Sequence, residues 1–64
     1  KQLSGLQVEI LSWIAKGKTN SEIALIVGRT ERAVAYHVSE ILAKISVSSR
    51  AQAAAFYAAL GLRD

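Results

Sequence analysis

The segment from Thr19 to Ile45 constrains the fold most strongly, because it reads as two short helices joined by a turn at Gly28. Thr19 and Glu22 form a Thr-x-x-Glu capping box, a common start of a helix. Thr30 supplies a second N-cap, and the residues that follow it carry an apolar stripe. Two short helices joined by a glycine-containing turn are typical of a helix-turn-helix, whose second helix can enter the DNA major groove. The segment therefore predicts an all-α fold.

A second capping box, formed by Ser4 and Gln7, predicts a helix that begins near Gly5 and ends before Gly17. Apolar residues recur around a wide arc of this segment, as they do in a buried scaffold helix. The arc comprises Leu6, Val8, Ile10, Leu11, Trp13, Ile14 and Ala15.

The two central helices are expected over about 20–27 and 31–45, and the helical period gives each of them a core-facing side. That side comprises Ile23, Ala24, Ile26 and Val27 in the first helix, and Val34, Val38, Ile41, Leu42 and Ile45 in the second. The opposite side of the second helix is small and polar and carries Arg32, Ala35, Tyr36, Ser39 and Ala43.

A fourth helix is expected over about 49–60, with Ser48 as its N-cap and Gly61 just after its end. Its sequence is apolar almost all round, which indicates burial on more than one side. In so short a chain one side can meet the protein's own core, and the other side needs a partner. We expect a symmetric homodimer. The interface residues would be Ala51, Ala54, Ala55, Tyr57 and Ala58.

The composition favours a binding domain. The 64 residues allow a single domain, expected to span 1–64 and to be a piece of a longer chain. The net charge of +3 suits a nucleic-acid partner. Cysteine is absent, which favours a reducing, cytoplasmic setting, and no apolar run reaches the length of a membrane span.

Sequence signals for catalysis, nucleotide binding and metal binding are incomplete. Gly17-Lys18-Thr19 imitates the end of a P-loop, but Ser12 stands where that motif needs its first glycine. The single histidine, His37, cannot build a zinc site without cysteines or clustered carboxylates, and a partly buried structural role suits it better. No nucleophile, base and orienting acid form a catalytic triad. We therefore expect no enzymatic activity, no metal and no cofactor.

Several segments, taken in order, resemble the C-terminal DNA-binding domain of LuxR-type transcription regulators over about residues 3–62. The run EILSWIAKGKT, residues 9–19, is similar to the autoinducer-binding, quorum-sensing branch of that family. The pieces EIA, AVAYH and ILAKI are similar to its recognition-helix block, and SSRAQA is similar to its last helix. The resemblance implies a scaffold helix, a helix-turn-helix pair and a dimerising fourth helix.

The resemblance also implies that the helix over 31–45 docks on double-stranded DNA, as a dimer on an inverted repeat. Base-facing positions fall on Ala35, Tyr36 and Ser39, with Arg32, a residue type that reads guanine, close by. Phosphate contacts are expected from basic side chains, from His37 and from backbone amides at a helix N-terminus. The candidates are Lys16, Lys18, Thr19, Asn20, Ser21, Arg29, His37, Lys44 and Arg50. An upstream regulatory domain and RNA polymerase are the further partners implied.

The chain departs from the usual pattern of the family in three regions. Leu6 and Gln7 stand where an Arg-Glu pair is frequent, so the capping role survives and the charge is lost. Arg29 occupies a turn position that is usually hydrophobic. Ala33 and Ala35 replace polar residues of the recognition helix, so base reading is expected to rest on the other outward side chains.

Other interpretations stay open. The chain also fits the output domain of a phosphorylation-driven response regulator of the same superfamily, although Trp13 and Gly17-Lys18-Thr19 favour the quorum-sensing branch. A sigma-factor region shares a similar helix-turn-helix, but the apolar fourth helix argues against it. The alternative from a different functional class is a helical protein-interaction module that docks through its fourth helix. In that case the basic face would have no role in binding.

Overall fold

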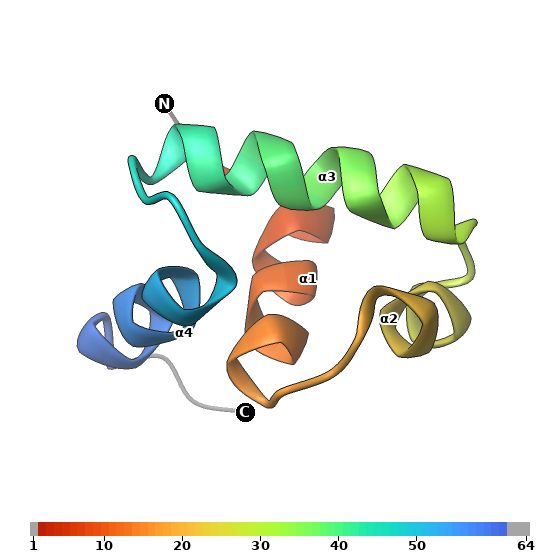
Figure 1. The fold of residues 1–64 in the computed structure, drawn as a ribbon, viewed down its shortest axis with the longest axis horizontal. Coiled ribbons are helices and arrows are strands. Elements are labelled where there is room, and N and C mark those ends of the chain that lie inside the picture. The colour runs from red at the N-terminus through yellow and green to blue at the C-terminus, as the bar shows by residue number, and fades with distance from the viewer. Residues whose placement is uncertain (1, 62–64) are drawn as a thin grey trace.

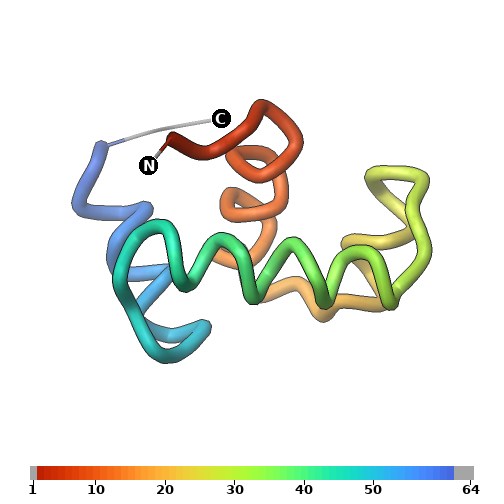
Figure 2. The backbone as a smooth tube through the Cα atoms, turned by 90° about the horizontal axis from the view of Figure 1, so that it is seen from above, coloured from red at the N-terminus to blue at the C-terminus, as the bar shows by residue number. Residues whose placement is uncertain are grey.

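The computed structural model describes residues 2–61, which form four helices and thereby confirm the expected all-α fold. The helices are α1 (Gly5–Ala15), α2 (Asn20–Val27), α3 (Glu31–Lys44) and α4 (Arg50–Ala59). Helix α1 is central and packs against the other three. Helix α3 lies across α1, and α2 and α4 lie on opposite sides of it (Figure 1). Seen from above, α3 extends along one side of the molecule as its longest element (Figure 2).

The predicted caps of the first three helices are confirmed. The hydroxyl of Ser4 accepts the Gln7 amide at 3.1 Å, and the Gln7 side chain accepts the Ser4 amide at 3.2 Å. The same reciprocal pair joins Thr19 and Glu22, at 3.1 and 2.8 Å. Thr30 caps α3 by accepting a backbone N–H at 3.0 Å. Each cap satisfies backbone donors that the first helical turn leaves unpaired.

The N-cap of α4 is Ser49, and the prediction of Ser48 was wrong. Ser49 has an extended backbone, and its hydroxyl accepts the Gln52 amide at 3.1 Å. Since the helix begins at Arg50, only the residue directly before it can reach that amide. Ser48 instead donates from its amide and its hydroxyl to the Gln52 side-chain oxygen, at 2.7 and 2.9 Å.

The sequence did not predict the way in which α3 ends. Ser46 adopts a left-handed backbone with φ of 59°, the one non-glycine residue among those described that does so. Its amide donates to the carbonyl of Ala43 at 3.2 Å, and the amide of Val47 donates to Leu42 at 3.0 Å. These two bonds form a Schellman motif, which usually places glycine at this position. Gly17 and Gly28 occupy the left-handed positions predicted for the ends of the first two helices.

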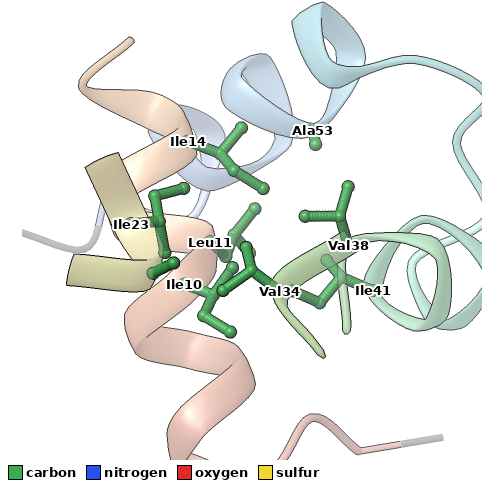
Figure 3. Close-up of a cluster of buried hydrophobic side chains, with 9 residues drawn as sticks. Ile10, Leu11, Ile14, Ile23, Val34, Val38, Ile41 and Ala53 are labelled. Carbon is green, nitrogen blue, oxygen red and sulfur yellow. The ribbon is translucent and has the colours of Figure 1, made fainter. Parts of the chain in front are cut away.

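The core gathers side chains from all four helices around α1 (Figure 3). The fully buried or nearly buried members are Ile10, Leu11, Ile14, Ile23, Ala24, Val34, Val38, Ile41 and Ala53. All of these except Ala53 were predicted from the helical period. Trp13, Phe56 and Tyr57 are partly buried and pack against this cluster.

Two predicted core residues are exposed instead. Ile26 is 43% exposed, because α2 is a two-turn helix that packs mainly on α3 and buries only a narrow side. Val8 is 39% exposed, because it lies on the flank of α1 turned toward a shallow hollow. That hollow is lined by Gln2, Leu3, Val8, Lys44, Ile45, Ser46, Phe56 and Leu60. None of the helices within residues 2–61 has both the length and the apolar character that a membrane crossing requires.

Candidate nucleic-acid interface

The outward side of α3 is the surface best placed to meet a double helix. Arg32, Ala35, Tyr36 and Ser39 are all exposed there, and 62% of Tyr36 is accessible. Their spacing along the helix keeps them on one side, opposite the buried stripe that begins at Val34. Within residues 2–61 the exposed guanidinium of Arg32 has no hydrogen-bond or charged partner, so its donors are available to a ligand. The structure therefore brings the four predicted base-reading positions together.

The N-terminus of α2 offers fewer free amides than predicted. The amide of Thr19 donates to Glu22 Oε1 at 2.8 Å, and the amide of Glu22 donates to Thr19 Oγ1 at 3.1 Å. The amides of Asn20 and Ser21 follow the cap and lack an acceptor among the described residues. A phosphate at this helix end would meet those two amides and the positive end of the helix dipole.

Glu22 adds a negative charge to the same helix end. The backbone N–H of Thr19 donates to its carboxylate, and this bond, reinforced by the nearby charge of Lys18, lowers the pKa of Glu22 from its ordinary value of 4.5. The carboxylate is fully exposed and stays ionised at neutral pH. A carboxylate in the first turn also suits the helix dipole.

Arg50 has partners inside the molecule. Its Nη1 donates to Asn20 Oδ1 and its Nη2 donates to the carbonyl of Lys18, both at 2.7 Å. These bonds tie the start of α4 to the loop between α1 and α2. The structure gives Arg50 a bracing role at the N-terminus of α2, and its predicted contact with phosphate stays a prediction.

Gln7 joins α1 to the recognition helix and was missed as a site residue. It is only 4% exposed. Its Oε1 accepts from Lys44 Nζ at 2.8 Å, and its Nε2 lies 3.4 Å from His37 Nδ1. Lys44 and His37 are both half-buried, and His37 was predicted to be so. Helical spacing to the core residues Ile10 and Ile14 could have predicted the burial of Gln7, but not its contacts with α3.

The other predicted cations differ in their surroundings. Arg29 is exposed in the turn between α2 and α3, and its backbone amide donates to the carbonyl of Ala24 at 3.0 Å. Lys18 is half-buried. Lys16 Nζ lies 4.8 Å from the centre of the Trp13 ring, in a cation–π contact at the far end of α1.

The outer side of α4 is a stripe of small apolar residues. Ala51, Ala55 and Ala58 are exposed, whereas Ala54 and Tyr57 are half-buried, and Tyr57 packs against the protein's own core. The predicted interface set therefore divides into an accessible part and a part that also supports the monomer. Among residues 2–61 no group of three or more histidine or acidic side chains is arranged to hold a metal ion.

Comparisons with known proteins agree on one family. Residues 1–57 match the family described as bacterial regulatory proteins, luxR family. The chain is 42% identical to the transcriptional activator protein AnoR of Acinetobacter nosocomialis over 60 residues, which are 94% of this chain and 25% of that protein. It is 43% identical to the quorum-sensing regulator RhlR of Pseudomonas aeruginosa, with the same two coverages.

The regulatory protein SdiA of Escherichia coli is 43% identical over 54 residues, which are 84% of this chain and 22% of that protein. The chain thus spans about a quarter of the length of the relatives it matches. Together with the four-helix fold and the helix-turn-helix of α2 and α3, these matches show that the chain belongs to the luxR family of bacterial regulatory proteins.

Proposed function

We propose that this chain is the DNA-binding output domain of a bacterial transcription regulator, with α3 in the major groove of double-stranded DNA. The observation that supports this most is the outward side of α3, where the unpartnered Arg32 stands beside Tyr36 and Ser39. The major groove, about 12 Å wide, admits a helix mounted in this way. The domain acts by binding and carries out no chemical reaction.

Base reading and phosphate binding fall to different groups. Arg32, Tyr36 and Ser39 read base edges, and the methyl group of Ala35 meets a thymine methyl. Phosphates are held by basic side chains beside α3, including Lys44 and Arg29, and by the amides of Asn20 and Ser21. Lys18 and His37 complete this set, and Arg50 contributes by bracing Asn20.

The active form is a homodimer paired through α4, bound to an inverted repeat whose half-sites lie about one helical turn apart. Each copy makes few contacts, and pairing raises affinity through effective concentration. An upstream regulatory domain controls the pairing, in line with the quorum-sensing role named for RhlR. The bound dimer contacts RNA polymerase, and since bacterial DNA lies in the cytoplasm, the protein acts there.

A salt titration of duplex binding tests the proposal. A DNA ligand is first selected from a randomised duplex pool, and affinity is then measured from low to moderate salt. If about five phosphates are neutralised, the slope of log affinity against log salt is about −4 to −5. No binding at low salt, or an affinity indifferent to salt, contradicts the proposal and leaves a protein-interaction module as the better interpretation.

Replacing Arg32 tests base reading separately. Arg32→Ala removes a bidentate donor to guanine, so it should relax the preference at one base pair by about 1–3 kcal/mol. Lys16→Gln is the charge control, because Lys16 directly follows α1, whose C-terminal end points away from α3 (Figure 1). Even a phosphate contact from Lys16 would affect all sequences alike and leave the base preference unchanged. An Arg32→Ala variant that selects the same sequences with the same discrimination removes Arg32 from the readers.

A further inference from the structure

The buried amide of Gln7 faces two α3 side chains that are candidates for phosphate binding. Gln7 is the one polar residue in the buried class among residues 2–61. His37 and Lys44 lie two helical turns apart on the same flank of α3, between its core side and its outward side. Both reach Gln7 across the contact between α1 and α3.

The orientation of the Gln7 amide is determined by its neighbours. Its Oε1 receives Lys44 Nζ at 2.8 Å and the backbone N–H of Ser4 at 3.2 Å. Both of these groups can only donate. A flipped amide would set its own NH₂ against two donors, so Oε1 must occupy this place and Nε2 must point toward His37.

That orientation fixes the tautomer of His37. Gln7 Nε2 is a donor, so His37 Nδ1, 3.4 Å away, must be the acceptor. The neutral imidazole then carries its proton on Nε2. The ring of His37 meets the edge or face of Tyr36, with centroids 5.6 Å apart, but its Nε2 has no hydrogen-bond partner among residues 2–61. Since no fully buried side-chain nitrogen there lacks a hydrogen-bond partner, this N–H is accessible to solvent.

The same amide holds Lys44 without cancelling its charge. One of the three donors on Lys44 Nζ is used on Gln7 Oε1, which is neutral. A glutamate at position 7 would keep the capping box and the contact, but it would pair its negative charge with the ammonium group.

We propose that Gln7 is a positioning residue for phosphate binding: it directs the Nε2–H of His37 outward and orients Lys44 with its full charge. The DNA part of this proposal rests on the proposed function. The tautomer part concerns the free protein and stands independently. A residue of α1 thereby determines how the two side chains on this flank of α3 are oriented.

The first test is nitrogen NMR of the His37 ring in the free chain at about pH 8, where histidine side chains are ordinarily neutral. The proton is expected on Nε2 in the wild type. In Gln7→Glu the carboxylate can only accept, so the proton should move to Nδ1. A wild-type ring protonated on Nδ1, or a tautomer unchanged in Gln7→Glu, overturns the assignment to Gln7.

The second test is the salt slope of duplex binding. Gln7→Glu should make the slope shallower by about 0.9, the amount for one phosphate contact, and Lys44→Met should do the same. In the Lys44→Met background Gln7→Glu should change the slope no further. Circular dichroism and thermal unfolding establish that each variant is folded.

The outcomes separate the two proposals. Wild-type binding with a slope that Gln7→Glu leaves unchanged overturns the role of Gln7 and leaves the proposed function intact. A wild type that does not bind duplex DNA overturns the proposed function and the DNA part of this inference, while the NMR result still decides the tautomer part.

Discussion

At the residue scale, the capping box formed by Thr19 and Glu22 makes the stability of α2 depend on pH. The pKa of Glu22 is lowered in the folded state, chiefly because its carboxylate accepts the Thr19 amide. A lowered folded pKa gives stability that is present above the ordinary value of 4.5 and is lost as pH falls through the folded value. The start of the proposed DNA-binding unit is therefore expected to weaken in acid.

Glu22→Gln tests this expectation, because glutamine keeps the capping geometry, as Gln7 does in α1. At neutral pH the wild type should have the higher free energy of unfolding. The difference should begin to shrink as the pH falls below about 4.5, where the carboxylate of the unfolded chain becomes protonated, and it should disappear as the pH passes through the lower pKa of the folded state. Urea unfolding of both proteins over a series of pH values measures it, and a constant difference would show that the charge of Glu22 contributes nothing.

Sequence signals that act within one helical turn predicted the helix starts correctly. A Ser or Thr followed three residues later by Glu or Gln fixes a helix start through hydrogen bonds inside one turn, which is why Ser4 and Thr19 were identified correctly. The same rule also selects Ser49, because Gln52 stands three residues after it, whereas Ala51 stands three residues after Ser48. The prediction of Ser48 overlooked this signal, and the observed start of the helix agrees with the rule.

At the element scale, α4 depends on one small residue for its approach to α1. Ala53 is fully buried in the core, where it meets side chains of the other helices (Figure 3). An interior at close-packed density has no room there for three more carbon atoms. The spacing of the helices around α1 therefore depends on alanine at this position.

Ala53→Leu should lower the free energy of unfolding by about 1–3 kcal/mol, the usual cost of overpacking a core. Ala59→Leu adds the same atoms at an exposed position of the same helix, and it should change stability by less than about 0.5 kcal/mol. Urea or thermal unfolding compares the two. Equal effects at the two positions would mean that α4 is not held closely by Ala53.

Helical periodicity predicted the core sides but not the extent to which neighbours cover them. The stripe of α3 was identified correctly because fourteen residues give the period room to repeat. Ile26 was misassigned because α2 has eight residues, and its coverage depends on where α3 crosses it. Gln7 was missed as a site residue for a related reason. Its partners His37 and Lys44 lie 30 and 37 residues later, and no local pattern announces such a contact.

At the scale of the whole molecule, the proposed DNA-binding and pairing surfaces belong to different elements. The first is the outward side of α3, and the second is the outer side of α4, near the C-terminal end of α3 (Figures 1 and 2). A pair formed through α4 would leave both copies of α3 uncovered. Pairing and DNA binding can therefore occur together, as an inverted repeat requires.

The pairing surface is tested with a charge that the monomer tolerates. Ala54 is half-buried, so a glutamate there would disturb the monomer as well as the interface. Ala55 is exposed on the outer stripe, and Ala55→Glu should weaken dimers while leaving the thermal unfolding of the monomer unchanged. Leu25→Glu is the matched control, because Leu25 is 84% exposed on α2, on the other side of α1.

Sedimentation over a range of protein concentrations, with and without a duplex carrying two half-sites, measures the association. Ala55→Glu should abolish the rise in mass with protein concentration. It should also reduce the affinity for a duplex with two half-sites far more than for a duplex with one, because unpaired copies no longer raise each other's effective concentration at the DNA. Leu25→Glu should preserve both properties. If Ala55→Glu associates as the wild type does, the copies meet through another surface, and the small apolar stripe of α4 is not the pairing surface.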